Sequence, residues 1–558
     1  MGISILKMKM NKKNLSVFIV LSSLFFVSSM FSCTSTEVIE KKELVWNDDV
    51  KLSNELVRFD EILEKDALKA VWKIKTLEKE FGKTDRIQES LEKAVEKAGE
   101  NFKKSLDDEN IVQALRYAFS FSAAGIKYPG ASESDIERLK EKLSEKVPGL
   151  SENKSSKQAL KVSTYVDGTV TVFVDKGLKI MGGMGMADAV LGSGFFISKD
   201  GYIVTNHHVI SDMVDPKYEG FCRLYVKLAD DPDTKIPAKV IGYDSVLDLA
   251  LLKAQVDAPY VFELGSSKGL EVGDRIFAIG SPLGLEKTLT GGVVSAVDRK
   301  LFTIGNVFQI DAAVNSGNSG GPIIDNEGRV QAIVFAGVPN YQGLNFAIPV
   351  EYLRYELPLL ASGGKRNHVW SGSYGRTKRE PGFGTKEEGV LVNYVLPGSS
   401  ASLSGLKAGD VIKKVNSFTV SSLDDLQNIF ISLSEGTIVN LGTENDNFLI
   451  YLEKRPDNPG KTIYETDLLS NSMLPIFGTD LISLSSGARK KFKIKSVLKG
   501  SLADSLGFSS EDPLTVYKAE LDKNGENAYF ELSAKKRKNG YIEMSMGVTA
   551  SLDSPYYF

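Results

Sequence analysis

The chain has 558 residues, with 68 Lys and Arg against 72 Asp and Glu, and a formal net charge of −4. This length exceeds what one hydrophobic core supports, so we expect three to five domains. The hydrophobic share of 42% and the charged share of 25% are typical of soluble globular proteins. The slightly acidic balance, without a basic run rich in aromatics, excludes a nucleic-acid binder.

The first residues have the pattern of an export signal. Lysines at positions 7, 9, 12 and 13 precede an uncharged stretch from Leu15 to Ser32, which ends at Cys33. This pattern predicts a bacterial lipoprotein signal over residues 1–32, with Cys33 as the lipidated first residue of the mature chain. A plain membrane anchor is the alternative, because the apolar stretch is almost long enough to span a bilayer. Both interpretations predict an exported protein, and residues 33–44 would form a polar tether.

Cysteine and histidine are scarce. If Cys33 carries lipid, only Cys222 remains, so the chain has no intrachain disulfide. Cys222 lies in an apolar stretch and is expected to be a small core residue. The three histidines, His207, His208 and His368, are too few and wrongly spaced for a metal enzyme. We therefore expect neither a metal nor another cofactor.

Residues 45–150 are predicted to form an α-helical domain of three to five helices. The segment is rich in Glu, Lys, Leu and Ala, and its apolar residues recur at helical spacing. Ser132 to Asp135, directly before apolar positions, is a helix-start signature. The charged residues are expected to form a solvated face, although a role in assembly or in holding a partner is an alternative. The polar stretch from Ser151 to Lys157 would be a linker.

Residues 160–362 are predicted to form a domain of short β-strands. A strand-like alternation begins at Thr169, and Asp200-Gly201 between two apolar segments is a strong hairpin signal. Many short strands with frequent glycine turns are typical of a double β-barrel. A Gly/Met-rich insertion from Gly182 to Val190 precedes the hairpin and is expected to be a loop, either merely flexible or, as the family resemblance given below implies, regulatory.

Three segments of this domain carry residues suited to catalysis. His207 and His208 follow the second strand of the hairpin, and Asp248 directly precedes an apolar strand. Ser319 lies in a glycine-rich turn, where backbone N–H groups can converge beside a nucleophilic hydroxyl. The order His208, Asp248, Ser319 is that of the chymotrypsin-like triad, in which the acid orients the imidazole that takes the serine proton.

Five ordered motifs resemble those of the HtrA (Deg) serine proteases: Thr205–Val209, Asp248–Leu252, Ala278–Leu285, Gly317–Pro322 and Asn345–Pro349. The resemblance implies a multidomain protein in which the helical module is followed by an all-β, double-barrel, chymotrypsin-like protease domain. One departure is Ser316, where the family commonly has proline. This change removes no catalytic group.

The resemblance also implies roles for individual residues. His208 would be general base and then acid, Asp248 would orient it, and Ser319 would attack the scissile carbonyl. The backbone of Gly317, Asn318 and Ser319 would form the oxyanion hole, with the N–H groups of Gly317 and Ser319 as donors. Digestive relatives have Asp where Asn318 stands, and asparagine cannot pair with a new N-terminus. Control by loop ordering is therefore expected in place of zymogen cleavage.

Two neighbours of the triad are given structural roles, and one strand is given a role in specificity. His207 is expected to be a bystander, and Asp244 a solvated turn residue. By resemblance, the strand through Ile333, Val334 and Phe335 would line the substrate pocket. It offers no acid for a basic side chain, so we expect a small or medium apolar residue before the scissile bond.

An internal repeat follows the protease domain. The segment Val395–Ala401 matches Val497–Ala503 at a separation of 102 residues. The first copy, in residues 366–458, resembles the PDZ domains of HtrA proteases, which take a peptide as an added strand. Its carboxylate loop would be Gly372–Gly375 or Gly382–Gly384. The second copy, in residues 462–558, is a degenerate PDZ-like α/β domain.

One further hypothesis concerns the aromatic residues Tyr556, Tyr557 and Phe558. A PDZ groove could capture them, either within the chain or between subunits.

The function expected from these features is that of an ATP-independent serine endopeptidase. It would cleave misfolded or unfolded envelope proteins, bind C-terminal peptides, and act in envelope quality control as a homo-oligomer. It would face the periplasm, attached to a membrane by its lipid. The alternative is a chaperone or peptide-binding scaffold whose protease site is silent.

Overall fold

The computed structural model describes ten stretches of the chain: residues 48–150, 162–214, 221–280, 288–301, 304–315, 317–337, 344–379, 386–485, 490–537 and 541–558. Several predictions therefore lie outside the described residues, namely those on the export signal, Cys33, the tether, the linker, Ser316 and Gly382–Gly384. Within the described stretches, no helix is both long and apolar enough to cross a membrane.

The described part of the N-terminal region contains six helices, more than the three to five expected: α2 (Asp48–Val57), α3 (Phe59–Lys65), α4 (Ala67–Phe81), α5 (Asp85–Asp107), α6 (Ile111–Ala123) and α7 (Glu133–Lys146). The side chains of Asp66, Thr84 and Asn110 each accept an N–H from the first turn of a helix. Ser132 and Asp135 form the capping box that the sequence predicts. These caps fix where the long helices begin.

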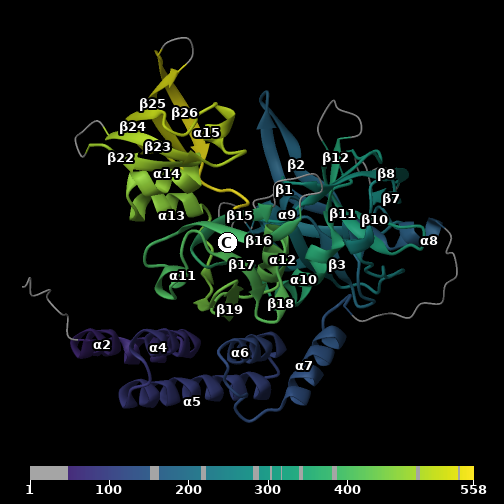
Figure 1. Cartoon of the computed structure of the whole chain (residues 1–558). Coiled ribbons are helices and arrows are strands. Elements are labelled where there is room, and N and C mark those ends of the chain that lie inside the picture. Colours follow the sequence, from purple (N-terminus) through teal and green to yellow (C-terminus); the bar gives the residue numbers. More distant parts are fainter. Residues whose placement is uncertain are drawn as a thin grey trace, which may run out of the picture. The chain divides into compact units, whose positions relative to one another are not determined.

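Two closed barrels follow, as expected for the protease domain (Figure 1). The first contains β1 (Thr169–Met181), β2 (Met184–Phe196), β3 (Tyr202–Thr205), β4 (Arg223–Lys227), β5 (Ile236–Asp244) and β6 (Leu249–Ala254). The second contains β7 (Arg275–Gly280), β8 (Thr288–Arg299), β9 (Val307–Ile310), β10 (Pro322–Ile324), β11 (Val330–Gly337) and β12 (Asn345–Pro349). Alternate side chains of the strands fill the barrels, and Cys222 is buried in the core of the first. The core role predicted for Cys222 is confirmed.

The Gly/Met-rich insertion is not a loop. It belongs to a long hairpin in which β1 and β2 pair from Thr169↔Phe195 to Met181↔Met184. Gly182 and Gly183 form the turn, with positive φ values of 58° and 83°. Because the Met and Gly residues of this hairpin are exposed, its sequence lacks the alternation of apolar and polar residues that normally identifies a strand. Backbone pairing between β1 and β2 holds the hairpin together.

The first PDZ domain is a sheet in the order β15-β16-β17-β19-β20 with two helices. Its elements are β15 (Ser373–Arg379), β16 (Glu387–Val395), α11 (Ser400–Leu403), β17 (Val411–Val415), β18 (Phe418–Thr419), α12 (Leu423–Ile431), β19 (Ile438–Thr443) and β20 (Asn447–Tyr451). Helix α10 (Val350–Ala361) and the short strands β13 (Gly364–Lys365) and β14 (Val369–Trp370) connect it to the second barrel. Strand β14 pairs with β21 (Glu453–Lys454).

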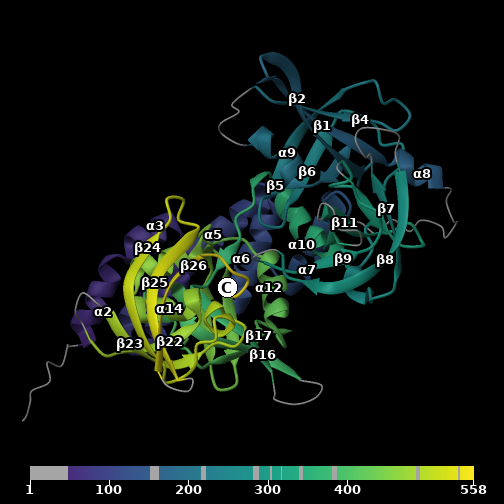
Figure 2. The ribbon, with the colours of Figure 1, turned by 90° about the horizontal axis from the view of Figure 1, so that it is seen from above.

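The second PDZ-like domain repeats the sheet but not the long helix. Helices α13 (Pro459–Thr466) and α14 (Leu469–Phe477) precede β22 (Thr479–Ser483), β23 (Lys490–Val497), α15 (Leu502–Ser505), β24 (Pro513–Leu521), β25 (Asn527–Arg537) and β26 (Tyr541–Ser551). The last three strands lie side by side (Figure 2). Only residues 522–526 separate β24 from β25, so this copy has no counterpart of α12. The degeneracy seen in the sequence is therefore the loss of one wall of a PDZ groove.

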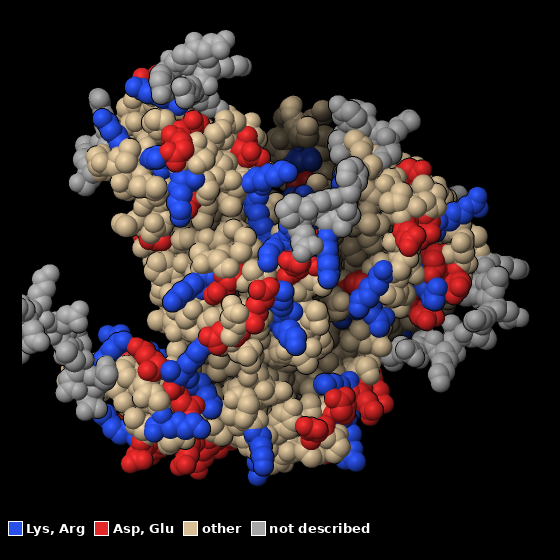
Figure 3. Space-filling model, viewed as in Figure 1, with Lys and Arg blue, Asp and Glu red and all other residues tan. Residues whose placement is uncertain are grey.

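The helical region packs on the first PDZ domain through hydrogen bonds as well as apolar contacts. Trp72 Nε1 donates to the Leu449 carbonyl at 2.8 Å and lies 3.1 Å from Ser404 Oγ. On helix α6, Ser120 Oγ accepts the N–H of Ile438 at 3.0 Å. On the face shown in Figure 3, basic and acidic side chains are interspersed. This mixture agrees with a solvated surface.

Candidate active site

The candidate base lies at the junction of β3 and helix α9 (His207–Val214). Strand β3 pairs with β6 from Tyr202↔Lys253 to Thr205↔Ala250, so the residues just after β3 face those just before β6. This register brings His208 against Asp248: Nδ1 of His208 lies 2.7 Å from Oδ2 of Asp248. The strand pairing thus unites two residues separated by 40 positions in the sequence.

Hydrogen bonds hold both the side chain and the backbone of Asp248 in place. Its Oδ1 accepts the backbone N–H of His208 at 2.7 Å, and its carbonyl accepts Nδ2 of Asn206 at 2.9 Å. Its φ of 54° is in the left-handed region, which non-glycine residues seldom adopt. Such strain persists only where the surroundings impose it, and it is typical of functional sites. Asp248 is buried, whereas the side chain of His208 is 47% exposed and open to a substrate.

The nucleophile candidate is held in its turn by the other barrel. Ser193 of β2 donates from its backbone N–H to the Ser319 carbonyl at 2.8 Å and from Oγ to the Gly317 carbonyl at 2.6 Å. Thr205 Oγ1 in turn donates to the Ser193 carbonyl at 2.7 Å. Gly320, with a φ of 84°, leaves no room for a side chain beside Thr205. No role was predicted for Ser193 from the sequence, in which its only signal is its position between two glycines.

The Ser319 hydroxyl does not face the candidate base. Its Oγ donates to the Phe335 carbonyl at 3.3 Å, and no hydrogen bond links it to His208 in the described part of the chain. The rings of His208 and Phe335 meet edge to face, with centroids 6.4 Å apart. The site therefore has a formed His-Asp pair and a serine turned aside.

The backbone of the turn provides donors for an oxyanion. The Asn318 N–H is already used, because it donates to the Asn315 carbonyl at 3.0 Å. The N–H groups of Gly317 and Ser319 donate to no backbone acceptor among the described residues. Of the three residues named for the oxyanion hole, these two have N–H groups that no backbone acceptor in the described stretches engages.

The strand predicted to line the pocket contributes less than expected. Ile333 and Val334 are fully buried in the apolar cores of the barrels, so their side chains cannot line an open pocket. Neighbouring side chains of a strand point to opposite faces, and in a closed barrel both of these faces are covered. Only Phe335 is partly exposed beside Ser319. The side chains of Ile333 and Val334 therefore do not take part in an open pocket, and lining by the backbone of this strand stays a prediction.

His207 has the expected structural position. Its ring stacks on Tyr243, with centroids 5.2 Å apart and planes 17° apart. Burial lowers the pKa of His207, although Asp248 and Asp244 oppose the shift. A neutral, stacked imidazole is a packing element, and its partners differ from those of His208.

Asp244 is not the solvated turn residue that was expected. It is completely buried, and its Oδ2 lies 2.8 Å from Nε2 of His368. Burial disfavours its charged form, but His368 and the N–H groups of Val246 and Leu247 hold its pKa below the usual value. Its neighbours in the sequence gave no sign of a partner 124 positions away.

A second buried pair adjoins Asp244. Arg366 donates from Nε to Oε2 of Glu356 at 2.9 Å, and from Nη2 to the carbonyls of Ile431 and Leu433 at 2.9 and 2.6 Å. Ligand atoms of Asp244, Glu356 and His368 lie within 4.8 Å of one another, close enough for a metal ion. Because Arg366 and backbone donors already engage both carboxylates, we interpret the cluster as an ion-pair network.

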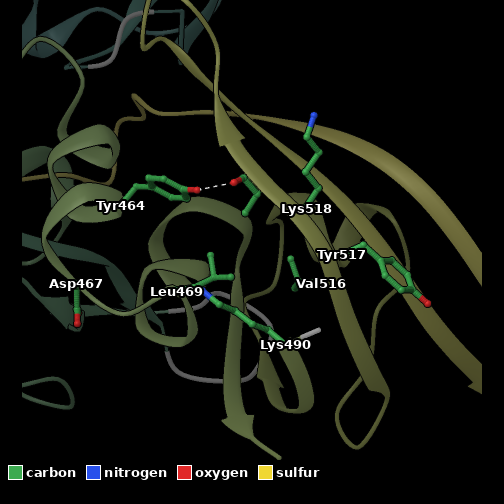
Figure 4. Close-up of a pocket in the computed structure, with 8 residues that line it drawn as sticks. Tyr464, Asp467, Leu469, Lys490, Val516, Tyr517 and Lys518 are labelled. Carbon is green, nitrogen blue, oxygen red and sulfur yellow. Dashed lines mark hydrogen bonds between the residues drawn. The ribbon is translucent and has the colours of Figure 1, made fainter. Parts of the chain in front are cut away.

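A hollow lies in the second PDZ-like domain, away from these residues (Figure 4). It is lined by Tyr464, Asp467, Leu469, Lys490 and residues 516–519. Tyr464 donates from its hydroxyl to the Ala519 carbonyl at 2.8 Å, and burial raises the pKa of this phenol. No triad residue lines the hollow, and we assign it no function.

Comparisons with known proteins agree with this architecture. Residues 192–333 match the trypsin-like peptidase domain, residues 371–441 the PDZ domain, residues 460–552 the TP0546 family PDZ domain, and residues 51–143 a domain of unknown function. The last match covers most of the helical region, for which the sequence suggested no chemistry.

Curated relatives align with the central part of the chain. A probable periplasmic serine endoprotease DegP-like of Marinomonas sp. is 33% identical over 345 residues, which cover 58% of this chain and 70% of that protein. Another of the same name, from Bartonella henselae, is 38% identical over 281 residues, covering 48% of this chain but only 54% of that protein. Among solved structures, the HtrA-type protease AlgW with decapeptide has a TM-score of 0.42 and 26% identity, covering 53% of this chain and 98% of that one.

Proposed function

Because this chain belongs to the family of DegP-like serine endoproteases, we propose that it is a serine endopeptidase acting through His208, Asp248 and Ser319. The observation that carries the proposal is the 2.7 Å contact between His208 Nδ1 and Asp248 Oδ2. Both carboxylate oxygens of Asp248 are engaged, so the imidazole is held by Nδ1 and its Nε2 is left for the nucleophile.

The reaction follows from these positions. Ser319 Oγ attacks the scissile carbonyl while His208 Nε2 takes its proton, and Asp248 stabilises the imidazolium that forms. The N–H groups of Gly317 and Ser319 bind the oxyanion of the tetrahedral intermediate. His208 then gives the proton to the leaving amine, which leaves an acyl-enzyme. Water, activated by His208, releases the second product and restores Ser319.

The direction of the Ser319 hydroxyl supports a resting state that substrate or a ligand converts to the active one. Oγ must leave the Phe335 carbonyl, 3.3 Å away, and rotate toward His208 before it can be deprotonated. The same contact is the one observation that favours the alternative function, a chaperone with a silent protease site. Catalytic turnover by the isolated protein would reject that alternative.

Unfolded or misfolded proteins of the cell envelope are the proposed substrates. Protease and PDZ sites both bind extended chain, which a folded protein rarely exposes. The names of the relatives support a periplasmic location, and the sequence pattern supports attachment through lipid on Cys33. Replacing Cys33 with alanine should therefore move the exported protein from the membrane fraction to the soluble fraction. We also propose that the protein forms a homo-oligomer.

The test compares residues 34–558 with the same chain carrying Ser319→Ala. Each is incubated with casein as an unfolded substrate and with a fluorophosphonate probe. We expect cleavage and labelling by the parent only, and a loss of roughly 10⁴-fold or more in kcat for the variant. If neither protein cuts or labels but both suppress aggregation of the substrate, the chaperone function replaces the protease.

A further inference from the structure

Residues 555–558 lie along the edge of the first PDZ sheet as an added strand. The Ser373 N–H donates to the Phe558 carbonyl at 3.0 Å, and the Phe558 N–H donates to the Ser373 carbonyl at the same distance. The Gly375 N–H donates to the Tyr556 carbonyl at 3.0 Å, and Tyr374 faces Tyr557 in an antiparallel bridge. Strand β15 is the first of its sheet, so this segment covers an edge that would otherwise be open.

The side chains of this strand alternate between two environments. Phe558 is 2% exposed and belongs to the apolar core of the first PDZ domain. Tyr557, also 2% exposed, lies in a separate cluster with Trp370 and Tyr374. Arg376 covers the ring of Tyr556 at 4.2 Å from its centroid. Neighbouring side chains of an extended segment point to opposite faces, and main-chain pairing with a sheet edge is the way an extended peptide is recognised by strand addition.

Helix α12 forms the opposite wall of the groove. Gln427 on this helix is buried and donates from Nε2 to the Pro555 carbonyl, while its Oε1 accepts the Gly305 N–H at 3.4 Å. Phe430 on the same helix and Val369 belong to the same apolar core cluster as Phe558. Figure 1 shows this end of the chain beside β15 and β16. The segment therefore fills the space between strand and helix where an extended ligand of a PDZ domain would lie.

We propose that residues 555–558 are an intrachain ligand of the first PDZ groove and close it to other extended peptides. Residues Gly372–Gly375, one of the two candidate carboxylate loops, contact this segment. The proposal goes beyond the peptidase function and does not depend on it, because binding in the groove uses none of the triad residues.

The tether to the rest of the chain determines how strongly residues 555–558 compete with a free peptide for the groove. Arg455 pairs with Asp553, and the pair is largely buried, which fixes the chain just before the segment. A short tether gives an effective concentration on the order of 1 mM. For a free peptide with a Kd of about 10 µM, competition at about 1 mM weakens apparent binding roughly 100-fold.

The test measures binding of a fluorescein-labelled peptide with the sequence of residues 551–558. The protein is residues 34–558 with Ser319→Ala, so that the peptide is not cut. Phe558→Asp should expel the segment, because it places a carboxylate in an apolar cavity. The matched control is Phe418→Asp, since Phe418 is 53% exposed on β18 of the same domain. We expect roughly 100-fold tighter binding by Phe558→Asp and no change in the control.

Equal affinity in all three proteins, or no binding by Phe558→Asp at 1 mM peptide, would overturn the proposal. A second measurement covers the case in which Phe558→Asp fails to fold. A recognition site for a sequence-specific protease is inserted after Ser554, and the folded protein is cut there. The tethered segment becomes a free one, so peptide binding should rise after the cut. Unchanged binding with the segment released would again overturn the proposal.

Discussion

Asp244 and His368 form a buried pair, with Oδ2 of the acid 2.8 Å from Nε2 of the imidazole. The other oxygen of Asp244 accepts the N–H groups of Val246 at 2.8 Å and Leu247 at 3.1 Å. One carboxylate therefore shapes the turn that ends at Asp248 and binds the segment that enters the first PDZ domain. This relationship makes the geometry of the proposed triad depend on contacts outside the barrels.

We predict that Asp244→Ala lowers both stability and activity. The substitution leaves His368 and two backbone N–H groups without their acceptor, and breaking such a buried pair costs about 3 kcal/mol. Chemical unfolding measures the loss, and kcat should fall because the turn no longer holds Asp248 in place. The control is Asp257→Ala, an exposed aspartate in the same domain, which should change stability by less than about 0.5 kcal/mol. Similar losses in both variants would contradict the prediction.

The pH dependence of stability should report Glu356. Burial raises the pKa of Glu356 to about 7 from 4.5, with Asp244 adding to the shift and Arg366 and His368 opposing it. Between pH 4.5 and 7 the folded state therefore binds more protons than the unfolded state. The contribution of Glu356 to the free energy of unfolding is fully present below pH 4.5 and is lost as the pH rises through 7.

Glu356→Gln removes this titration, so its free energy of unfolding should fall less between about pH 5 and 7.5 than that of the parent. His207, whose lowered pKa acts in the opposite direction, is present in both proteins and cancels in the comparison. Asp244 titrates below 3.8, outside this window. Parallel pH profiles for the two proteins would show that Glu356 stays ionised throughout.

The triad assignment predicts a large kinetic effect without a structural one for Asp248→Asn. An amide next to Nδ1 holds the imidazole in the wrong tautomer, which costs about 10⁴-fold in kcat. Circular dichroism should show an unchanged fold. Asp257→Asn is the matched control and should retain full activity. A decrease of less than tenfold for Asp248→Asn would mean that Asp248 is not the acid of the triad.

The docking of the helical region on the PDZ domain should depend on Trp72. Trp72→Phe keeps a ring but removes the indole N–H that donates to the Leu449 carbonyl, which Ser404 Oγ still engages, so the cost should be about 1 kcal/mol. Trp72→Ala also removes packing and should cost about 3–5 kcal/mol. We expect the unfolding midpoint to decrease in the order Trp, Phe, Ala at position 72. We also expect proteolysis to cut the helical region of the variants earlier than that of the parent. An unchanged midpoint for Trp72→Ala would mean that the two parts do not stabilise each other.

Local patterns predicted the features that depend on neighbouring residues. The hairpin at Asp200-Gly201 and the capping box at Ser132 are both confirmed, because a turn or a cap is determined by the residues that form it. The approach of His208 to Asp248 was expected from the order of the motifs and the family resemblance. The pairing of β3 with β6 provides its physical cause.

The errors have a common origin in contacts between residues distant in the sequence. Asp244 was expected in solvent because an acid in a turn usually lies there, and only the fold brings His368 to it. Ile333 and Val334 were assigned to a pocket from the family resemblance, which does not say which side chains the barrels bury. Barrel closure buries both faces of β11 at this point. Ser193 escaped notice because its function is to hold the Ser319 turn of the other barrel.

Tyr557 has one further consequence. Its ring packs among Trp370, Tyr374 and Tyr394 of the first PDZ domain and Ile463 of the second. The side chain that helps to occupy the groove is thus also a joint between the two domains. A peptide that binds in the groove must displace the Tyr557 ring from between the two domains. Peptide binding would therefore let the two domains move relative to each other about a hinge. Energy transfer between fluorophores on the two domains would then report peptide binding as a change in the distance between the domains.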